Sequence, residues 1–368
     1  MAGDFTIGIE EEFQIIDPKT RELCGVVSEL VEAQTEIDQV SIQHELHQSM
    51  VEVATGICKD VHEARAEVEA NRRTLARIAA RANMAIGAAS THPMACWEDQ
   101  PTSKAERYTQ IVLELQDMAR ATLIFGMHVH VGIQDKDELI SVYNQARYFL
   151  PHLLALSTSS PFMRGRRTGL HSTRTHMFQR LPRTGIPDRF ESYSDFEGFV
   201  ETLIRTQCIG DHRRLWWDVR PHPTFSTLEF RICDLPTRVD DVITIAALIQ
   251  AIVVKLVRLH RQNLSFAKHR TEMMSENKWR AARYGVRGQL IDFRKRTEVP
   301  FSALASELLE FVDDVVDDLG SRKEAEGIER ICSEGTSADK QIQVFEKTGK
   351  LEPVVDYILE DTLRGVCN

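Results

Sequence analysis

The segment FTIGIEEEFQII, Phe5–Ile16, constrains the fold most, because it places three consecutive glutamates inside an otherwise apolar run. Its β-branched and aromatic residues, ended by an Asp-Pro pair, predict a strand. Side chains alternate between the two faces of a strand, so Glu10 and Glu12 share one face and Glu11 points to the other. Two neighbouring carboxylates repel each other, and a divalent cation with oxygen ligands would offset that cost. An exposed edge strand with solvated acids is the alternative.

A second strong strand is expected in FGMHVHVGI, residues 125–133, within a predicted strand over 124–133. His128 and His130 alternate with two valines, so both imidazoles face the same way. They are either satisfied core residues or ligands of a metal or a phosphate. As ligands they need a neighbouring strand that carries carboxylates, which Phe5–Ile16 could supply.

Two further segments carry acidic residues that could join this face. In TLEFRICD, residues 227–234, Glu229 and Arg231 share one face of a predicted strand. Such a pair is usually a plain ion pair, and it becomes significant if Glu10 and the histidines occupy the same face. In HELHQSMVE, Glu45 and Glu52 are seven positions apart. That odd spacing puts them on opposite faces of a regular strand, so they converge only through a turn or bulge.

Arginine replaces lysine over a long part of the chain. Residues 137–254 contain fourteen arginines and no lysine, whereas the whole chain has 33 arginines and 12 lysines. A guanidinium group binds carboxylate and phosphate through two parallel hydrogen bonds, which an ammonium group cannot do. The segment SPFMRGRRTGLHSTR, residues 160–174, has four arginines and two glycines. It predicts a loop that clamps an anionic substrate, with a solvated basic loop as the alternative.

The remaining pattern predicts an α+β domain with a helical C-terminal cover. Helices are expected over 61–81, 104–123, 137–157, 195–208 and 240–260, further strands over 50–54, 84–89, 216–220 and 227–232, and a long functional loop over 161–187. The last hundred residues are expected to be mostly helical. The apolar run 242–257 contains Gln250, which favours a buried helix over a membrane span.

Composition narrows the class of protein. A chain of 368 residues with 42% hydrophobic content can bury a sizeable core. The net charge of −10 argues against a nucleic-acid binder, since such proteins neutralise phosphates with basic residues. Seven scattered cysteines and the lack of a secretory signal pattern indicate free thiols in a reducing cytoplasm. We therefore expect a cytoplasmic protein with no nucleic-acid or membrane partner.

As an ordered set, the motifs GIEEEF, GMHVHVG, SSPF…R and TLEFRICD resemble the carboxylate–amine ligases of the glutamate–cysteine ligase type 2 family. The resemblance runs from about residue 6 to residue 260 and continues more loosely beyond. It implies the catalytic fold of glutamine synthetase and guanido kinases, a curved and mostly antiparallel sheet with helices on its convex side. It also implies a single catalytic domain over 1–368, with a sheet core over about 4–265 and a helical cover over about 266–368.

The resemblance further implies roles for individual residues. Expected ligands of the metal that bridges the ATP phosphates are Glu10, His128 and Glu229, and those of a second metal near the amino acid are Glu12, Glu45 and Glu52. His130 and Arg231 are expected to reach phosphate oxygens. Candidates for the substrate carboxylate or the transferring phosphoryl group are Arg164, Arg174 and Arg220, with Arg220 and Arg231 as the expected catalytic pair.

The implied reaction uses ATP with Mg²⁺ or Mn²⁺. A glutamate-like carboxylate attacks the γ-phosphate to give an acyl phosphate and ADP, and a cysteine-like amine then displaces phosphate to form an amide. Metal ions and arginines stabilise the negative charge of both steps. A kinase of the same fold and a nucleotide-binding protein without catalysis are the alternatives, and a homodimer is compatible with the family.

Overall fold

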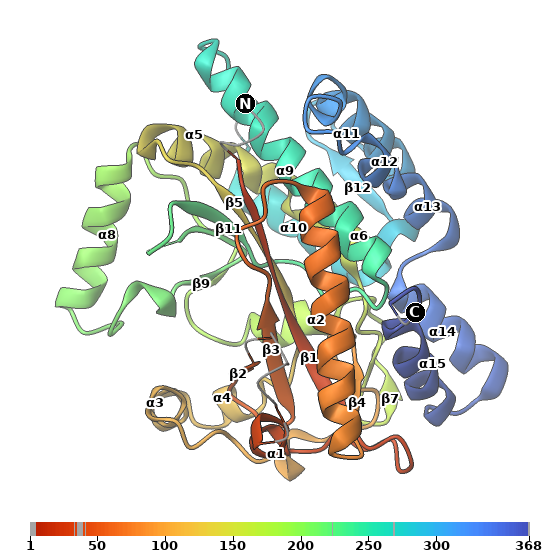
Figure 1. Ribbon diagram of the computed structural model, residues 1–368. Coiled ribbons are helices and arrows are strands. Elements are labelled where there is room, and N and C mark those ends of the chain that lie inside the picture. The colour runs from red at the N-terminus through yellow and green to blue at the C-terminus, as the bar shows by residue number, and fades with distance from the viewer. Residues whose placement is uncertain are drawn as a thin grey trace.

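The computed structural model describes residues 5–32, 34, 40, 42–222, 224–267 and 269–366 (Figure 1). The expected first residue of the sheet core, residue 4, and the last residue of the helical cover, residue 368, lie outside the described residues. One buried apolar cluster includes residues from Phe5 through Val366, so the sheet and the C-terminal helices share a core.

A sheet of seven strands forms the centre of the fold, in the order β10-β11-β5-β1-β3-β2, with β4 paired to β1. Every pairing within this sheet is antiparallel, as expected. Its strands are β1 (Ile7–Ile16), β2 (Ile42–His44), β3 (Met50–Ala54), β4 (Ala85–Gly87), β5 (Met127–Gly132), β10 (Val219–Pro221) and β11 (Thr227–Phe230). Strand β1 is apolar because it is buried in the centre of the sheet, between β5 and β3, with helices packed on one of its faces.

Helices cover one face of this sheet. Helix α2 (Val61–Arg81) begins at Asp60, whose side chain accepts hydrogen bonds from two backbone N–H groups of the first turn, and its apolar stripe packs on β1. Helix α9 (Val239–Arg261) packs on α2 and β5. It is long and apolar enough to cross a membrane, but 83% of its most apolar window is buried inside the protein, as expected for a core helix.

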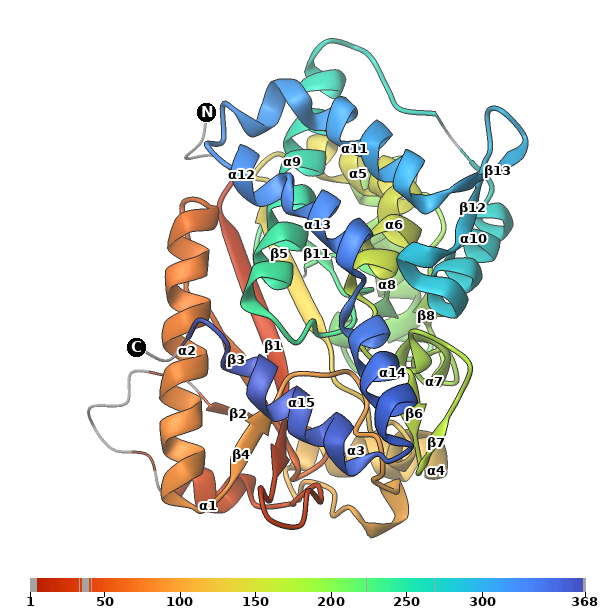
Figure 2. The same ribbon diagram turned by 90° about the vertical axis from the view of Figure 1, so that its right-hand side faces the viewer.

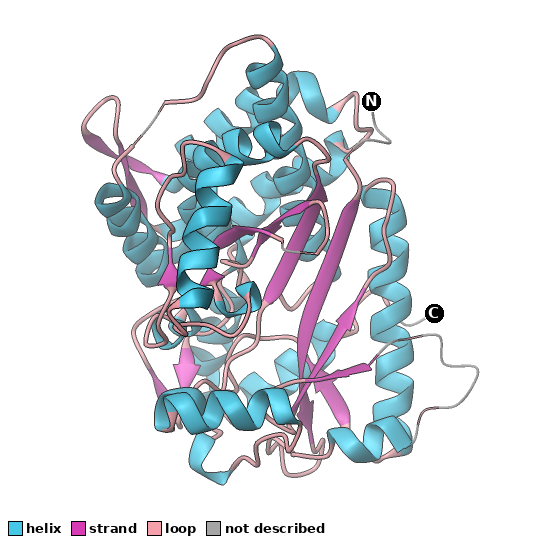
Figure 3. Cartoon of the chain, turned by 90° about the vertical axis from the view of Figure 1, so that its left-hand side faces the viewer, coloured by secondary structure: helices cyan, strands magenta, loops and turns pink. Residues whose placement is uncertain are grey.

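The C-terminal part adds further helices, several of which pack on α9 (Figure 2). Its helices are α10 (Thr271–Tyr284), α11 (Phe301–Val316), α12 (Arg322–Ala325), α13 (Gly327–Glu334), α14 (Ser337–Thr348) and α15 (Glu352–Thr362). The hairpin β12 (Gln289–Asp292) and β13 (Thr297–Pro300) interrupts them, which the sequence analysis did not predict. Figure 3 shows the opposite face of the sheet, which is partly covered by shorter helices and loops. A pocket lined by many charged residues lies against this face.

These peripheral segments differ from the sequence prediction in several places. The helix expected over 104–123 is split into α3 (Glu106–Leu115) and α4 (Asp117–Arg120), because Gln116 adopts a left-handed φ of 51°. The region expected to be a loop, 161–187, contains the hairpin β6 (Phe162–Met163) and β7 (Arg166–Arg167), helix α7 (Thr173–Phe178) and strand β8 (Thr184–Gly185), which pairs with β9 (Trp216–Trp217).

The other predicted helices are confirmed with shifted bounds. Helix 137–157 is present as α5 (Lys136–Ala146), a 3₁₀ turn and α6 (Leu150–Ser157), and helix 195–208 is α8 (Tyr193–Arg205). A short helix α1 (Val27–Glu32), which was not predicted, follows β1. The strands expected over 124–133 and 84–89 are shorter than predicted, as their flanking residues connect to neighbouring loops.

Candidate active site

Strand β1 separates its three glutamates as the alternation predicts. Glu10 and Glu12 are partly exposed on the open face, whereas Glu11 is 2% exposed on the covered face. There Glu11 pairs with the fully buried Arg72 of α2 at 2.6 Å. The strand therefore directs two carboxylates toward a pocket and anchors the third in the core.

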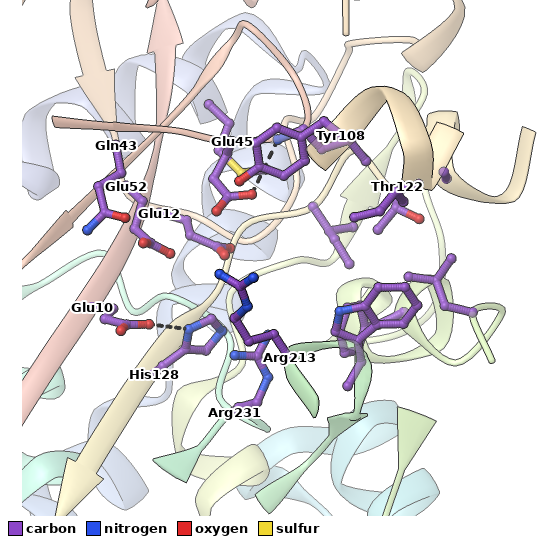
Figure 4. Close-up of a pocket in the computed structure, with 18 of the residues that line it drawn as sticks. Glu10, Glu12, Gln43, Glu45, Glu52, Tyr108, Thr122, His128, Arg213 and Arg231 are labelled. Carbon is purple, nitrogen blue, oxygen red and sulfur yellow. Dashed lines mark hydrogen bonds and ion pairs between the residues drawn. The ribbon is translucent and has the colours of Figure 1, made fainter. Parts of the chain in front are cut away.

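The antiparallel register brings the predicted residues of different strands side by side. Glu10 lies opposite His128 on β5, and Glu12 lies opposite Glu52 on β3. Farther along the sheet, Glu229 on β11 lies opposite His130. Segments far apart in the sequence thus contribute to one wall, as Figure 4 shows for Glu10, Glu12, Glu52 and His128.

Two groups on this wall have ligand atoms close enough to hold a cation. The first consists of Glu10, Glu52 and His128, and the second of Glu10, His130 and Glu229, with the atoms of each group within 4.8 Å of one another. Glu10 links them, since its two oxygens lie 2.8 Å from Nδ1 of His128 and 3.2 Å from Nε2 of His130. These two groups distribute the expected set of Glu10, His128 and Glu229 differently: Glu229 lies with His130, its partner in the register, and Glu52 lies with His128.

The second expected set, Glu12, Glu45 and Glu52, lines the same pocket. Glu45 follows β2 in the turn to β3, which supplies the change of direction that its spacing from Glu52 requires. Glu12 accepts a hydrogen bond from the backbone N–H of Gly126, and Glu45 accepts one from the N–H of Leu46. All three carboxylates therefore face one cavity.

The electrostatics of the wall show an excess of negative charge at one end. Burial, followed by repulsion from Glu10 and Glu45, raises the pKa of Glu52 well above its ordinary value. Burial and repulsion from Glu12 raise the pKa of Glu45 to about 7. Arg107 offsets this effect only in part at Glu45, and Arg231 only in part at Glu52; a bound cation would relieve the remaining repulsion.

The other end of the wall is balanced by histidine and arginine. Burial raises the pKa of Glu10, but hydrogen bonds with His128 and His130 outweigh this effect and hold the pKa well below its ordinary value. Burial likewise opposes ionisation of Glu229, yet Arg231 and Arg220 hold its pKa far below the ordinary range. Glu10 and Glu229 are thus ionised and ready to act as ligands.

Two of the predicted arginines donate hydrogen bonds to Glu229. Arg220 donates to its Oε2 at 2.5 Å, and Arg231 donates to its Oε1 at 2.5 Å. Nε of Arg231 is buried and has no hydrogen-bond partner among the described residues. Both guanidinium groups line the pocket and place positive charge on its wall.

The remaining two arginines differ from expectation. Arg174 lines the pocket, but its terminal nitrogens donate to the backbone carbonyls of Arg231 and Ile232, so it supports the site more than it faces a ligand. Arg164 lies on the β6–β7 hairpin and pairs with Glu98 at 2.7 Å. Its side chain is half-exposed and does not line the pocket, so its position does not support a role in substrate binding.

The pocket has a volume of about 280 Å³ and a second wall that the sequence analysis did not identify. This wall faces the charged sheet and consists mainly of apolar side chains from α3, α4, the α7 region and β9, namely Tyr108, Ile111, Ala119, Thr122, Phe178, Leu181 and Trp216. Figure 4 shows Tyr108 beside Glu45 and Thr122 on the side away from Glu10. Apolar residues in short helices carry no distinctive signal, which is why they were missed.

Comparison with known proteins gives concordant matches. The family model described as glutamate-cysteine ligase family 2 matches residues 6–357. A relative from Sorangium cellulosum, provisionally named glutamate–cysteine ligase 2, is 51% identical over 99% of this chain and 98% of its own length. A relative from Herpetosiphon aurantiacus with the same provisional name is 50% identical over 98% of this chain and 94% of its own length.

Two solved structures share the fold at low sequence identity. A glutamate–cysteine ligase from Francisella tularensis, solved in complex with AMP, has a TM-score of 0.73 at 13% identity and covers 99% of this chain and 89% of that one. A bifunctional glutathione synthetase from Pasteurella multocida has the same TM-score and identity, over 99% of this chain and 53% of that one. The expected fold class is thereby confirmed.

Proposed function

The chain belongs to the glutamate-cysteine ligase family 2, and on that premise we propose that it is an ATP-dependent carboxylate–amine ligase. Its substrates are a glutamate-like amino acid, whose carboxylate is activated, and a cysteine-like amine, which accepts the acyl group. The products are an amide, ADP and phosphate. The names of the relatives and the complex of the Francisella enzyme with a nucleotide support this proposal.

The observation that carries the proposal is the wall of ionisable residues from strands β1, β3, β5, β10 and β11. It combines carboxylates with His128, Arg220 and Arg231 in one pocket, and His130 contacts Glu10 beside it, a combination suited to a nucleoside triphosphate with its divalent cations. The donor set fits Mg²⁺ or Mn²⁺, because it is rich in oxygen ligands and contains no thiolate. The raised pKa values of Glu45 and Glu52 support the same assignment, since cations would relieve the repulsion between these carboxylates.

One cation would be held by Glu10, His128 and Glu52. A second cation, bound to the phosphates, would be held by Glu10, His130 and Glu229. The acidic end of the pocket would be completed by Glu12 and Glu45. When bound, the cations would neutralise charge on the phosphates and on the substrate carboxylate. His128 and His130, which contact Glu10 through ring nitrogens, would supply nitrogen ligands to these cations.

The arginines of the wall stabilise charge that develops during phosphoryl transfer. As the carboxylate attacks the γ-phosphate, negative charge accumulates on the equatorial oxygens and on the leaving ADP. Arg231 and Arg220 line the pocket in which this charge would develop, and Arg220 also holds Glu229 in place through a hydrogen bond. The second step, attack of the amine on the acyl phosphate, needs the same stabilisation of the departing phosphate.

The apolar wall would keep water away from the acyl phosphate. Residues such as Phe178, Leu181 and Trp216 leave few polar groups to orient a hydrolytic water on that side. They come from α7 and the β8–β9 pair, within and next to the region expected to close over the substrate. Exclusion of water favours amide formation over simple hydrolysis of ATP.

A screen of paired amino acids and amines tests the proposal. Each pair is incubated with ATP and Mg²⁺ or Mn²⁺, ADP release is recorded, and mass spectrometry searches for the condensed product. We expect ADP and an amide in equal amounts for at least one pair. A phosphorylated product without amide would instead identify a kinase of this fold. Absence of turnover with every pair and both metals would contradict an enzymatic function.

A further inference from the structure

An aromatic pair adjoins the site at the turn between β10 and β11. The rings of His222 and Phe225 are stacked, with centroids 4.6 Å apart and an angle of 14° between their planes. His222 lines the pocket and meets His130 edge-on at a centroid distance of 5.4 Å. A continuous series of rings therefore leads from the Glu10–His130–Glu229 group to the outside of the protein.

The outer ring of this pair is unusually open. Phe225 is 59% exposed, although His222 beneath it is largely covered. A single exposed phenylalanine needs no explanation. This one differs, because it lies flat on a ring that lines the pocket and thereby extends the pocket wall outward.

The turn holds both rings in a fixed geometry. Nδ1 of His222 accepts hydrogen bonds from the backbone N–H groups of Thr224 and Phe225, at 3.3 and 3.0 Å. The backbone N–H of His222 in turn donates to the carbonyl of Thr227 at 2.9 Å, and the N–H of Thr227 donates to the carbonyl of Phe225 at 2.7 Å. These two hydrogen bonds to Nδ1 orient the imidazole ring on which Phe225 stacks.

From this arrangement we propose that Phe225, supported by His222, is the platform on which the adenine base of ATP stacks. The proposal rests on the function proposed above, since it needs the triphosphate to lie at the Glu10–His130–Glu229 group. From there the ribose and the base extend past His130 along the series of rings. Base stacking on an aromatic side chain requires an exposed ring face next to a phosphate site, and the β10–β11 turn provides both.

The apolar wall is the competing location for the base. Its residue Tyr108 lies beside Glu45, at the acidic end of the pocket (Figure 4). A base placed there would leave the triphosphate among the carboxyl groups of Glu12, Glu45 and Glu52. The β10–β11 turn instead adjoins the end that His130, Arg220 and Arg231 make attractive to phosphate.

Calorimetric titration with two ligands tests the platform. The full-length protein is titrated with ATP and separately with tripolyphosphate, each with Mg²⁺ and without amino acid or amine. We expect Phe225→Ala to raise the Kd of ATP by roughly 5- to 100-fold, the usual range for loss of base stacking, and to leave the Kd of tripolyphosphate unchanged. Phe225→Tyr, which keeps the ring, should bind ATP like the wild type.

A matched control variant removes an exposed apolar side chain elsewhere in the protein. Leu264, which is 56% exposed and distant in the chain, is replaced by Ala to control for loss of a large apolar surface residue. If Phe225→Ala keeps the wild-type preference for ATP over tripolyphosphate, the platform is refuted and the ligase function stands. If the wild type binds neither ligand, the use of ATP falls, and the platform falls with it.

Discussion

Replacing Glu11 by Gln gives the most specific test of how β1 is built into the fold. The Glu11 side chain is 2% exposed and its partner Arg72 is fully buried. The Arg72 guanidinium also donates to the backbone carbonyls of Pro236, Thr237 and Thr362, at 3.2, 2.6 and 3.0 Å. One ion pair thus joins the central strand to α2, to the segment before α9 and to the C-terminal helix α15.

The size of the effect follows from burial of both charges. Gln cannot neutralise the guanidinium, and breaking a buried ion pair from one side costs about 3–5 kcal/mol. A domain is stable by only about 5–15 kcal/mol, so this single change removes a large part of the free energy of unfolding. Turnover of the molecules that remain folded should change little, because Glu11 faces away from the pocket.

Urea unfolding followed by tryptophan fluorescence measures the loss, with turnover recorded well below the unfolding midpoint. Glu10→Gln is the matched control one position away, on the opposite face. It should abolish most turnover and lower the free energy of unfolding far less than Glu11→Gln does. A free energy of unfolding for Glu11→Gln within about 1 kcal/mol of the wild type would refute the buried pair. Equal loss of turnover in the two variants would refute the assignment of faces.

Three further outcomes follow from the site. Glu229→Gln should reduce turnover at least about 100-fold in a steady-state assay, since a proposed metal ligand and the partner of two arginines is lost; near-normal turnover would exclude it as a ligand. Arg220→Ala should reduce turnover about 100-fold or more, whereas Arg164→Ala should retain most activity, so similar rates for the two would contradict their placement. The raised pKa of Glu45, about 7, means that its contribution to stability is present at low pH and is lost as the pH rises through about 7. Binding of Mn²⁺ should release protons from Glu45 and Glu52, so the affinity for Mn²⁺ should increase from pH 6 to pH 8. Calorimetry in buffers of different ionisation enthalpy measures both the affinity and the released protons. An affinity independent of pH would contradict this prediction.

Strand alternation allowed much of the site to be predicted from the sequence. A period of two is a local property, so the separation of Glu10 and Glu12 from Glu11 follows from the chain itself. The same rule placed His128 and His130 on one face. Pairing between strands is not local, so no pattern in the sequence specifies that Glu229 lies opposite His130. The resemblance to the family implied only that Glu229 shares a metal with Glu10 and His128.

Other differences have equally physical causes. The buried partner of Glu11 could not be identified, because it depends on how α2 docks onto the sheet. The break of the expected helix at Gln116 has no Gly or Pro to announce it. Four arginines within residues 160–174 looked equivalent in sequence, yet Arg174 is directed inward by α7 and Arg164 outward by the β6–β7 hairpin.

A titration with Mn²⁺ tests the central claim most directly, namely that the wall formed by β1, β3, β5 and β11 binds divalent cations. Free Mn²⁺ is followed by electron paramagnetic resonance in the presence of ATP and without an acceptor amine. Glu10 is shared by both groups of candidate ligands, so Glu10→Gln should weaken both sites, while Glu310→Gln on the surface of α11 should bind like the wild type. We predict two bound Mn²⁺ per chain for the wild type and fewer than one for Glu10→Gln under the same conditions. Equal binding by Glu10→Gln and the wild type would contradict the account.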